Sequence, residues 1–380
     1  MDGRSRSRAN EAKEPAPAAE LLRAAQEEED TEEDVHFPWR AGMVLDCRYQ
    51  LQELLGDGAF GRVLKARDLQ EDRDVALKVI RDVERYRENA EIEANILLDL
   101  RVADPENVSN CLRLYNAFLH NDAYYCLVCE LLGESLYDFL KLNGYRGYWL
   151  QDIQAFTIQS LQALKFIHGL TLTHTDLKPE NILLQTLEVP RVSTFPRGDL
   201  QPPSPRYANL PYVRPFTNLV KLVDFGSATY VDMHHSSVIQ TRQYRSPEVI
   251  LHMGWSDKAD LWSLGCILWE LYSGSMLFET HNSEEHLALM ERIIGNFPDS
   301  MLVRASEKAK ARFLSEGRLR WPENAESEES VMNVHRQWPL ADRVPPEHLD
   351  FVHFLSGLLS LDPSRREIPS SKFLSLEYRE

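Results

Sequence analysis

Two stretches decide the fold of this chain: His174-Thr175-Asp176-Leu177-Lys178-Pro179-Glu180-Asn181 and, further along, Asp224-Phe225-Gly226. The first spaces a carboxylate, a lysine and an amide along one short loop, and the second places another carboxylate before a glycine. Phosphoryl transfer from ATP needs a base for the acceptor hydroxyl, a cation near the transferring phosphate and oxygen ligands for magnesium. Asp-Phe-Gly alone is a weak signal because tripeptides recur by chance, but both motifs in this order are a strong one. We therefore predict that Asp176 is the base and that Asn181 and Asp224 hold the metal.

A glycine-rich run lies upstream: Gly56-Asp57-Gly58-Ala59-Phe60-Gly61-Arg62-Val63. Glycines there let the backbone approach the ATP phosphates with no Cβ in the way. Such a run can also open a dinucleotide-binding unit, but that unit continues as a helix. Here residues 49–55 before the run and 63–67 after it both have the pattern of a strand. The run therefore indicates a phosphate-binding turn between two strands.

A lysine follows on a third predicted strand, Val75-Ala76-Leu77-Lys78-Val79. From this strand Lys78 would reach the α- and β-phosphates, and a glutamate has to hold it there. Residues 86–100 have a helical pattern and contain two candidates, Glu91 and Glu93. Residues two apart on a helix point to different sides, so only one of them can face the lysine. We favour Glu93.

Length and composition fit an enzyme with two lobes. The chain has 380 residues, 43% of them hydrophobic, which suits roughly 300 folded residues and a tail. Cys126-x-x-Cys129 lacks a second pair of metal ligands and lies in an apolar run, so we interpret both as core thiols and not as a zinc site. No apolar run reaches the roughly 18–20 residues of a membrane helix, and no secretory signal is visible. We expect a soluble, intracellular, reduced protein with no membrane partner.

The formal net charge of −17 argues against nucleic acid as a direct partner and favours cationic partners. Charge alone leaves two interpretations open. One is a generally solvated acidic surface, and the other is a groove that docks basic peptides.

The chain divides into a tail and two lobes. Residues 1–46 are polar and poor in aromatic residues until Phe37 and Trp39, so we predict a disordered tail. Its run Arg4-Ser5-Arg6-Ser7-Arg8 is a short arginine–serine alternation and a weak nuclear signal. Residues 49–130 form a small lobe, and a hinge follows at 130–133.

The remaining residues, 134–378, have the pattern of a larger helical lobe. Helical spacing of apolar residues is clear over 153–169 and 260–272. A polar, proline-rich insert at 185–218 predicts an extended hairpin or loop. We expect Glu326-Ser327-Glu328-Glu329-Ser330 to be solvated.

Residues 49–378 as a whole resemble a eukaryotic protein kinase. Within them Glu285-His286-Leu287-Ala288-Leu289-Met290-Glu291-Arg292-Ile293-Ile294-Gly295 resembles the signature E-H-L-A-M-M-E-R-I-L-G of the LAMMER, or CDC-like, dual-specificity kinases. Only Leu289 and Ile294 depart from it. The resemblance implies an α+β, bilobal protein kinase fold, with a small β-rich N-lobe carrying one major helix and a larger, mainly helical C-lobe. We interpret Glu291 and Arg292 as residues that orient their helix.

The resemblance also implies an activity: transfer of the ATP γ-phosphate to Ser and Thr of proteins, and to Tyr in autophosphorylation. It implies ATP and Mg²⁺ as cofactors and basic, arginine/serine-rich splicing factors as substrates. It also implies a monomer in the nucleus, with a further expected presence in the cytoplasm. The alternative from another class is a catalytically inactive nucleotide-binding scaffold. The presence of Lys78, Asp176 and Asp224 disfavours it.

The predicted site has three groups of residues. The catalytic residues are Asp176, Lys178, Lys78 and Glu93, and the metal ligands are Asn181 and Asp224. The residues expected to bind ATP are Leu55, Gly56, Asp57, Gly58, Ala59, Phe60, Gly61, Val63, Ala76, Lys78, Cys129, Glu130, Leu132 and Leu183.

Further roles come from the resemblance alone. It implies an ion pair between Glu248 and Arg366, estimated at about 3–5 kcal/mol if one partner is removed. It also implies that Asp260 holds the catalytic loop and that Arg245 orients the loop facing the substrate. Ser236 and Ser237 are the expected autophosphorylation sites.

Three positions depart from common kinase patterns. Thr175 replaces an arginine that would receive an activation-loop phosphate, so we predict activity without upstream phosphorylation. Cys129 occupies the gatekeeper position at the back of the nucleotide cleft, and the reactivity of its thiol depends on its pKa. Ser246 replaces an alanine, a change that we expect to be silent.

Overall fold

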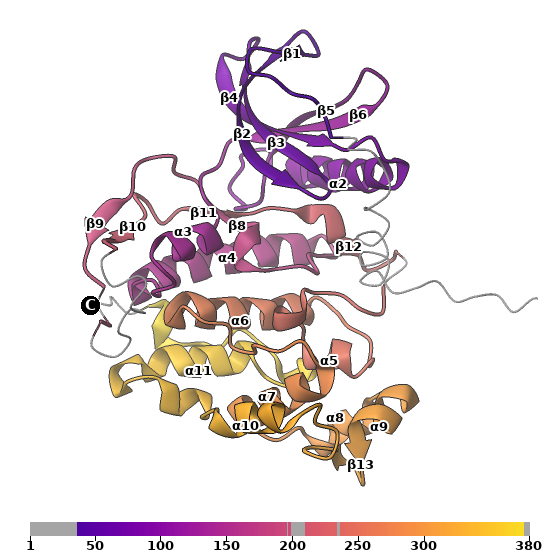
Figure 1. Cartoon of the computed structure of the whole chain (residues 1–380), viewed down its shortest axis with the longest axis vertical. Coiled ribbons are helices and arrows are strands. Elements are labelled where there is room, and N and C mark those ends of the chain that lie inside the picture. The colour runs from indigo at the N-terminus through magenta and orange to yellow at the C-terminus, as the bar shows by residue number, and fades with distance from the viewer. Residues whose placement is uncertain (1–35, 196, 199–209, 234–235, 376–380) are drawn as a thin grey trace, which may run out of the picture.

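The computed structural model describes residues 36–195, 197–198, 210–233 and 236–375. A β-sheet with one long helix stands over a larger group of helices (Figure 1). This is the predicted α+β fold with a β-rich N-lobe and a helical C-lobe. No helix in the described ranges is long and apolar enough to cross a membrane.

The N-lobe sheet is antiparallel throughout and is covered by α2 (Glu84–Ala103). Side chains alternate across each strand, so Val75, Leu77 and Val79 of one strand are buried in the sheet core. Ala76 and Lys78 point to the opposite face for the same reason. In sheet order the strands are β1 (Val44–Leu45), β2 (Tyr49–Gly58), β3 (Gly61–Asp68), β4 (Arg73–Ile80), β6 (Tyr124–Glu130) and β5 (Leu114–His120).

The prediction of a disordered tail over residues 1–46 is wrong for residues 36–46. Phe37 is buried and packs edge-on against Tyr124, with ring centroids 5.0 Å apart, and Leu45 of β1 is fully buried. Burial of these apolar side chains offsets the conformational entropy lost on ordering the segment. Residues 1–35, which include the arginine–serine run, lie outside the described residues.

The C-lobe is built around α6 (Lys258–Ser273), whose residues from Ala259 to Tyr272 are all buried. A helix that is apolar on every side belongs at the centre of a lobe. Around it lie α3 (Leu136–Leu142), α4 (Leu150–Gly169), α5 (Pro247–Ile250), α7 (Ser283–Ile294), α8 (Asp299–Arg304), α9 (Glu307–Phe313), α10 (Glu328–Arg336) and α11 (Leu349–Leu358). The helices predicted over 153–169 and 260–272 are thus confirmed.

Short strand pairs carry the site residues between the two lobes. Asn181 immediately precedes β8 (Ile182–Leu184), which pairs with β11 (Val220–Leu222), and Asp224 follows two residues after β11. A second pair joins β7 (Leu172–Thr173), which precedes the catalytic loop, to β12 (Thr229–Tyr230), which follows Asp224. A further pair, β13 (Leu314–Ser315) and β14 (Arg318–Leu319), lies far from it in the C-lobe.

The insert forms a hairpin, as predicted, with β9 (Arg191–Ser193) paired to β10 (Tyr212–Arg214). Arg214 fixes it to the C-lobe through two hydrogen bonds to the buried carboxylate of Asp152 on α4. Around the start of α10, Glu326 to Glu329 are exposed as expected, but Ser330 is buried. The Ser327 side chain caps α10 by accepting from the Ser330 amide, and the first helical turn places Ser330 inside.

Candidate active site

The glycine-rich run forms the tight turn between β2 and β3, where Gly58 pairs with Gly61. A Cβ on Gly61 would lie 2.2 Å from the carbonyl oxygen of Val79. The backbone of β4 therefore lies directly against this glycine, and no other residue fits without a shift. This contact fixes the turn over the strand that carries Lys78.

Lys78 donates to Glu93 of α2, with 2.8 Å between Nζ and Oε2, and Asp224 Oδ1 lies 3.9 Å from the same Nζ. Burial acts to lower the pKa of Lys78, but the carboxylates of Glu93 and Asp224 outweigh it, so the pKa is raised above its ordinary value. Glu93 is buried and Glu91 is exposed. The structure thus forms the predicted ion pair and places Glu91 outside it.

The back of the cleft is formed where β4 and β6 pair, because Ala76 lies opposite Cys129. Cys129 is 8% exposed. Burial raises the pKa of its thiol well above the usual range, and the charge of Glu93 adds to the shift. The thiol is therefore protonated at neutral pH, and a buried protonated thiol is a poor nucleophile. Cys126 is buried too, and both are free thiols, as predicted.

The catalytic loop is held by Asp260, the buried first-turn acid of α6. Its carboxylate accepts hydrogen bonds from the amides of His174 and Thr175, at 2.9 and 3.0 Å, and lies 2.9 Å from His168 Nε2. These contacts are the ones expected of a residue that holds the catalytic loop. His174 Nε2 lies 3.0 Å from the carbonyl oxygen of Val223, which ties the loop to the segment carrying Asp224.

Asp176 lies between a cation and residues 241–248, the segment that we call the peptide-docking segment. Its Oδ2 accepts from Lys178 Nζ at 2.7 Å. Its Oδ1 accepts from both the hydroxyl and the amide of Thr241, at 2.7 and 3.1 Å. These charge-assisted bonds fix the carboxylate in one orientation. A hydroxyl that approached Oδ2, which keeps a second lone pair, would thus meet an oriented acceptor beside an ammonium.

The donor set of the predicted metal ligands fits a hard divalent cation. Asn181 donates its Nδ2 to the Asp176 carbonyl at 2.9 Å, which leaves the amide oxygen as a ligand. Asp224 adopts a left-handed backbone with φ of 63°, and its neighbour Phe225 is fully buried against His174. Carboxylate and amide oxygens are the ligands that Mg²⁺ accepts.

The peptide-docking segment is anchored by the predicted ion pair. Arg366 Nη1 and Nη2 contact Glu248 Oε1 and Oε2 at 2.6 and 2.8 Å, with both side chains at most 1% exposed. Arg245 donates to the carbonyl oxygens of Ile239 and Gln240. Burial, with the nearby charge of Arg242, lowers the pKa of Arg245 to about 10, so it remains a cation at neutral pH.

Sequence reasoning missed Gln240. Its amide donates to the Thr175 carbonyl at 2.9 Å, and its side-chain Nε2 donates to the Ala259 carbonyl and the Ser263 hydroxyl. Its Oε1 accepts from the amide and the hydroxyl of Ser246. The structure therefore does not support the expectation that Ser246 is silent. That unusual serine was the only signal in the sequence for this buried contact.

The signature helix α7 makes structural contacts. Glu291 accepts from the Phe297 amide, and Arg292 donates to the Gln337 carbonyl. Burial lowers the pKa of His286 to about 3, so its ring is neutral.

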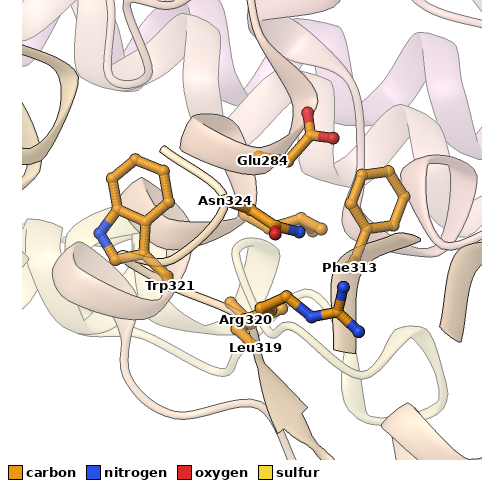
Figure 2. A pocket seen from close by; sticks show the side chains of 7 residues that line it. Glu284, Phe313, Leu319, Arg320, Trp321 and Asn324 are labelled. Carbon is orange, nitrogen blue, oxygen red and sulfur yellow. The ribbon is translucent and has the colours of Figure 1, made fainter. Parts of the chain in front are cut away.

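Beside the start of α7 lies a cavity of about 10 Å³, lined in part by Glu284, Phe313 and Trp321 (Figure 2). That volume suits one water molecule and no nucleotide.

Comparisons with known proteins agree with this geometry. The protein kinase domain family matches residues 49–373. Serine/threonine-protein kinase AFC3 of Arabidopsis thaliana is 42% identical over 344 residues, covering 89% of this chain and 83% of AFC3. Dual specificity protein kinase CLK1 of Homo sapiens is 38% identical over 346 residues, covering 89% of this chain and 67% of CLK1.

A solved structure is similar too. The crystal structure of the PF14_0431 kinase domain superposes with a TM-score of 0.83 at 39% identity, covering 90% of this chain and all of that one. A kinase domain uses ATP and a divalent metal. The matched relatives include AFC and CLK kinases, and α7 contains most of the stretch 285–295 that resembles the LAMMER signature. The chain is a protein kinase of the LAMMER, or CDC-like, dual-specificity family.

Proposed function

We propose that this chain transfers the γ-phosphate of Mg-ATP to serine and threonine in basic, arginine/serine-rich proteins. The observation that carries the proposal is the position of Asp176, oriented between Lys178 Nζ and Thr241. The proposed substrates are splicing factors, and the proposed place of action is the nucleus.

The nucleotide would lie between the lobes. The backbone of residues 130–133 would contact adenine, with Leu55, Val63, Ala76, Cys129 and Leu183 around the ring. Lys78, held by Glu93, would bind the α- and β-phosphates under the glycine-rich turn. Asn181 and Asp224 would hold Mg²⁺, whose charge offsets that of the β- and γ-phosphates.

In the proposed reaction, Asp176 Oδ2 accepts the proton of the substrate hydroxyl as the hydroxyl oxygen bonds to the γ-phosphorus. The bond between that phosphorus and the bridging oxygen of ADP breaks, and ADP leaves. The Lys178 ammonium offsets negative charge on the transferring group. Burial acts to lower the pKa of Lys178, but the Asp176 charge outweighs it, so the pKa is raised and the side chain is a cation.

The preference for basic substrates is supported by carboxylates next to the catalytic loop. Burial raises the pKa of Glu180, and the charges of Asp176 and Asp138 add to the shift although Lys178 opposes it. Burial and Asp138 likewise raise the pKa of Glu134. Both side chains are exposed, so a substrate arginine can reach them, and its charge would offset the repulsion from Asp138. These neighbouring carboxylates support a site that docks basic peptides.

The test uses phosphatase-treated protein and two peptides, one alternating arginine and serine and one acidic peptide with the same serines. We expect rapid transfer to the basic peptide only, and none by Asp176→Asn. Glu180→Gln should raise KM for the basic peptide about tenfold, the effect of losing one charge-assisted contact of about 1.4 kcal/mol. Glu329→Gln, an exposed acid on α10, should not.

The other outcomes are equally informative. Equal use of both peptides would overturn the basic preference and leave the kinase activity standing. Absence of transfer and of autophosphorylation would favour the inactive scaffold.

The nuclear location is tested by imaging the tagged chain with and without the run Arg4-Ser5-Arg6-Ser7-Arg8. The monomeric state is tested by sedimentation.

A further inference from the structure

A buried ion pair joins the hinge to the strand that leads to Asp224. Lys221, in the middle of β11, donates its Nζ to Glu130 Oε1 at 2.5 Å. The Lys221 side chain is 3% exposed and the Glu130 side chain 14%. A lysine is rarely buried to this degree unless it is paired. None of the roles proposed above uses Lys221.

The partners of Lys221 come from two separate pieces of the N-lobe. Glu130 ends β6 and begins the hinge. Its Oε1 also accepts from the Arg113 amide at 2.8 Å, where β5 is about to begin. Asn107, in the link between α2 and β5, accepts from the same Nζ at 2.7 Å. One ammonium thus satisfies groups from the hinge and from the link that follows α2.

Backbone pairing continues the same connection along β11. The Leu222 amide donates to the Asn110 carbonyl at 2.8 Å, and the Leu112 amide donates to the Leu222 carbonyl at 2.9 Å. On its other edge β11 pairs with β8, in which Leu183 lies opposite Lys221. The strand is therefore held on one side by the N-lobe and on the other by the C-lobe.

The two ends of this connection bind different parts of a nucleotide. The hinge follows Glu130, and Asp224 lies three residues after Lys221. Opposite charges in a buried setting interact strongly, and removal of one leaves the other desolvated and unpaired. The pair thus links the start of the hinge to the strand that ends two residues before Asp224.

We propose that Lys221 is a positioning residue that sets the distance between the adenine-binding hinge and Asp224. It acts through Glu130 and touches no reacting atom. The inference rests on the proposed function, because it takes residues 130–133 as the adenine contact.

The test is calorimetric binding of ADP with Mg²⁺ to the full chain, together with urea unfolding of each variant. Lys221→Met should weaken ADP binding about tenfold and raise KM for ATP more than it lowers kcat. The isosteric change Glu130→Gln should weaken binding in the same direction, and it carries the test if Lys221→Met does not fold. The double variant Lys221→Met/Glu130→Gln should recover most of the affinity, because it leaves no unpaired charge.

The matched control is Arg214→Met, which removes the partly buried partner of the buried Asp152 carboxylate and so breaks the ion pair between the insert hairpin and α4. It should lower stability and leave the ADP affinity unchanged. Wild-type affinity in Lys221→Met and Glu130→Gln would overturn the inference alone. Equal weakening by Arg214→Met would also overturn it, since loss of stability would then explain the effect. A wild-type chain that does not bind ADP would overturn the proposed function, and this inference with it.

Discussion

The Ser246 hydroxyl donates a hydrogen bond to Gln240 Oε1, at 3.1 Å, where Ser246 is fully buried and Gln240 is 7% exposed. Gln240 has a left-handed backbone, with φ of 67°, and both ends of its side-chain amide are bonded. The Gln240 backbone amide donates to Thr175, so the catalytic loop, the peptide-docking segment and α6 meet at this one residue.

The first prediction concerns this contact. Gln240→Ala leaves the Ser263 hydroxyl, the Ala259 carbonyl and the Ser246 amide without this partner. We expect the free energy of unfolding to fall by about 1–3 kcal/mol and KM for the peptide to rise more than KM for ATP. Ser246→Ala, which leaves the amide of residue 246 bonded to Gln240, should cost less than Gln240→Ala. Urea unfolding and steady-state kinetics measure both, and a larger cost for Ser246→Ala would contradict the role of Gln240.

Asp176→Asn tests the base. An amide cannot take the substrate proton, so kcat should fall about 10²–10⁴-fold. ADP affinity should stay near that of the wild type, because Asp176 contacts Lys178 and Thr241 and lies on the substrate side. Asp299→Asn, an exposed acid on α8, is the control. Retention of more than a tenth of the wild-type rate would exclude Asp176 as the base.

Arg366→Met tests the buried ion pair with Glu248. An unpaired buried carboxylate should lower the free energy of unfolding by about 3–5 kcal/mol. Arg312→Met, which breaks the more exposed pair with Glu284, should cost at most about 1 kcal/mol. Equal costs in urea unfolding would show that burial does not set the value of the Glu248–Arg366 pair.

A pH dependence follows from Glu270. Burial raises the pKa of Glu270 to about 7, although the hydrogen bond from Tyr244 opposes the shift. The folded chain therefore holds this proton more tightly than the unfolded chain, whose carboxyl has its ordinary pKa of 4.5. The stabilising contribution is complete below that ordinary value and is lost as the pH rises through 7.

Glu270→Gln should consequently increase stability relative to the wild type at pH 8 and have little effect at pH 4. The difference amounts to about 1.4 kcal/mol for each pKa unit of the shift. Urea unfolding at pH 4, 6 and 8 measures it, with the exposed Glu347→Gln as control. A difference that grows toward low pH would mean that the sign is wrong.

The last prediction is that phosphatase treatment changes the activity by no more than about a factor of two. A change of that size is well below the tenfold effect that a loss of about 1.4 kcal/mol would produce. Thr175 donates its hydroxyl to the Ser227 carbonyl at 2.6 Å, and the Thr175 carbonyl accepts from the Gln240 amide. Two residues of the activation segment (residues 224–248), Ser227 and Gln240, are thus bonded to the catalytic loop without a phosphate. Thr175→Val, which is isosteric and keeps the backbone bond, should lower activity. A treated wild type that is inactive until rephosphorylated would overturn this explanation.

Local patterns in the sequence predicted most of the elements that carry the site. The alternation around Lys78 predicted its strand, and helical spacing predicted α4 and α6. The order of the two opening motifs, with the glycine-rich run, predicted the chemistry of the site, and the resemblance to a eukaryotic protein kinase implied the fold. The region of Phe37 was predicted wrongly, since two aromatic residues, Phe37 and Trp39, in a polar segment give no periodic signal.

The sequence by itself determined which chemical groups this protein has and along which elements they lie, because backbone propensity and side-chain period act over a few neighbouring residues. Only the tertiary structure decided that Ser246 has a partner in Gln240, that Lys221 pairs with Glu130 and that Cys129 is a protonated thiol. Lys221 and Glu130 are 91 residues apart in the chain. The strength of such a contact depends on desolvation, which arises only when distant segments pack together.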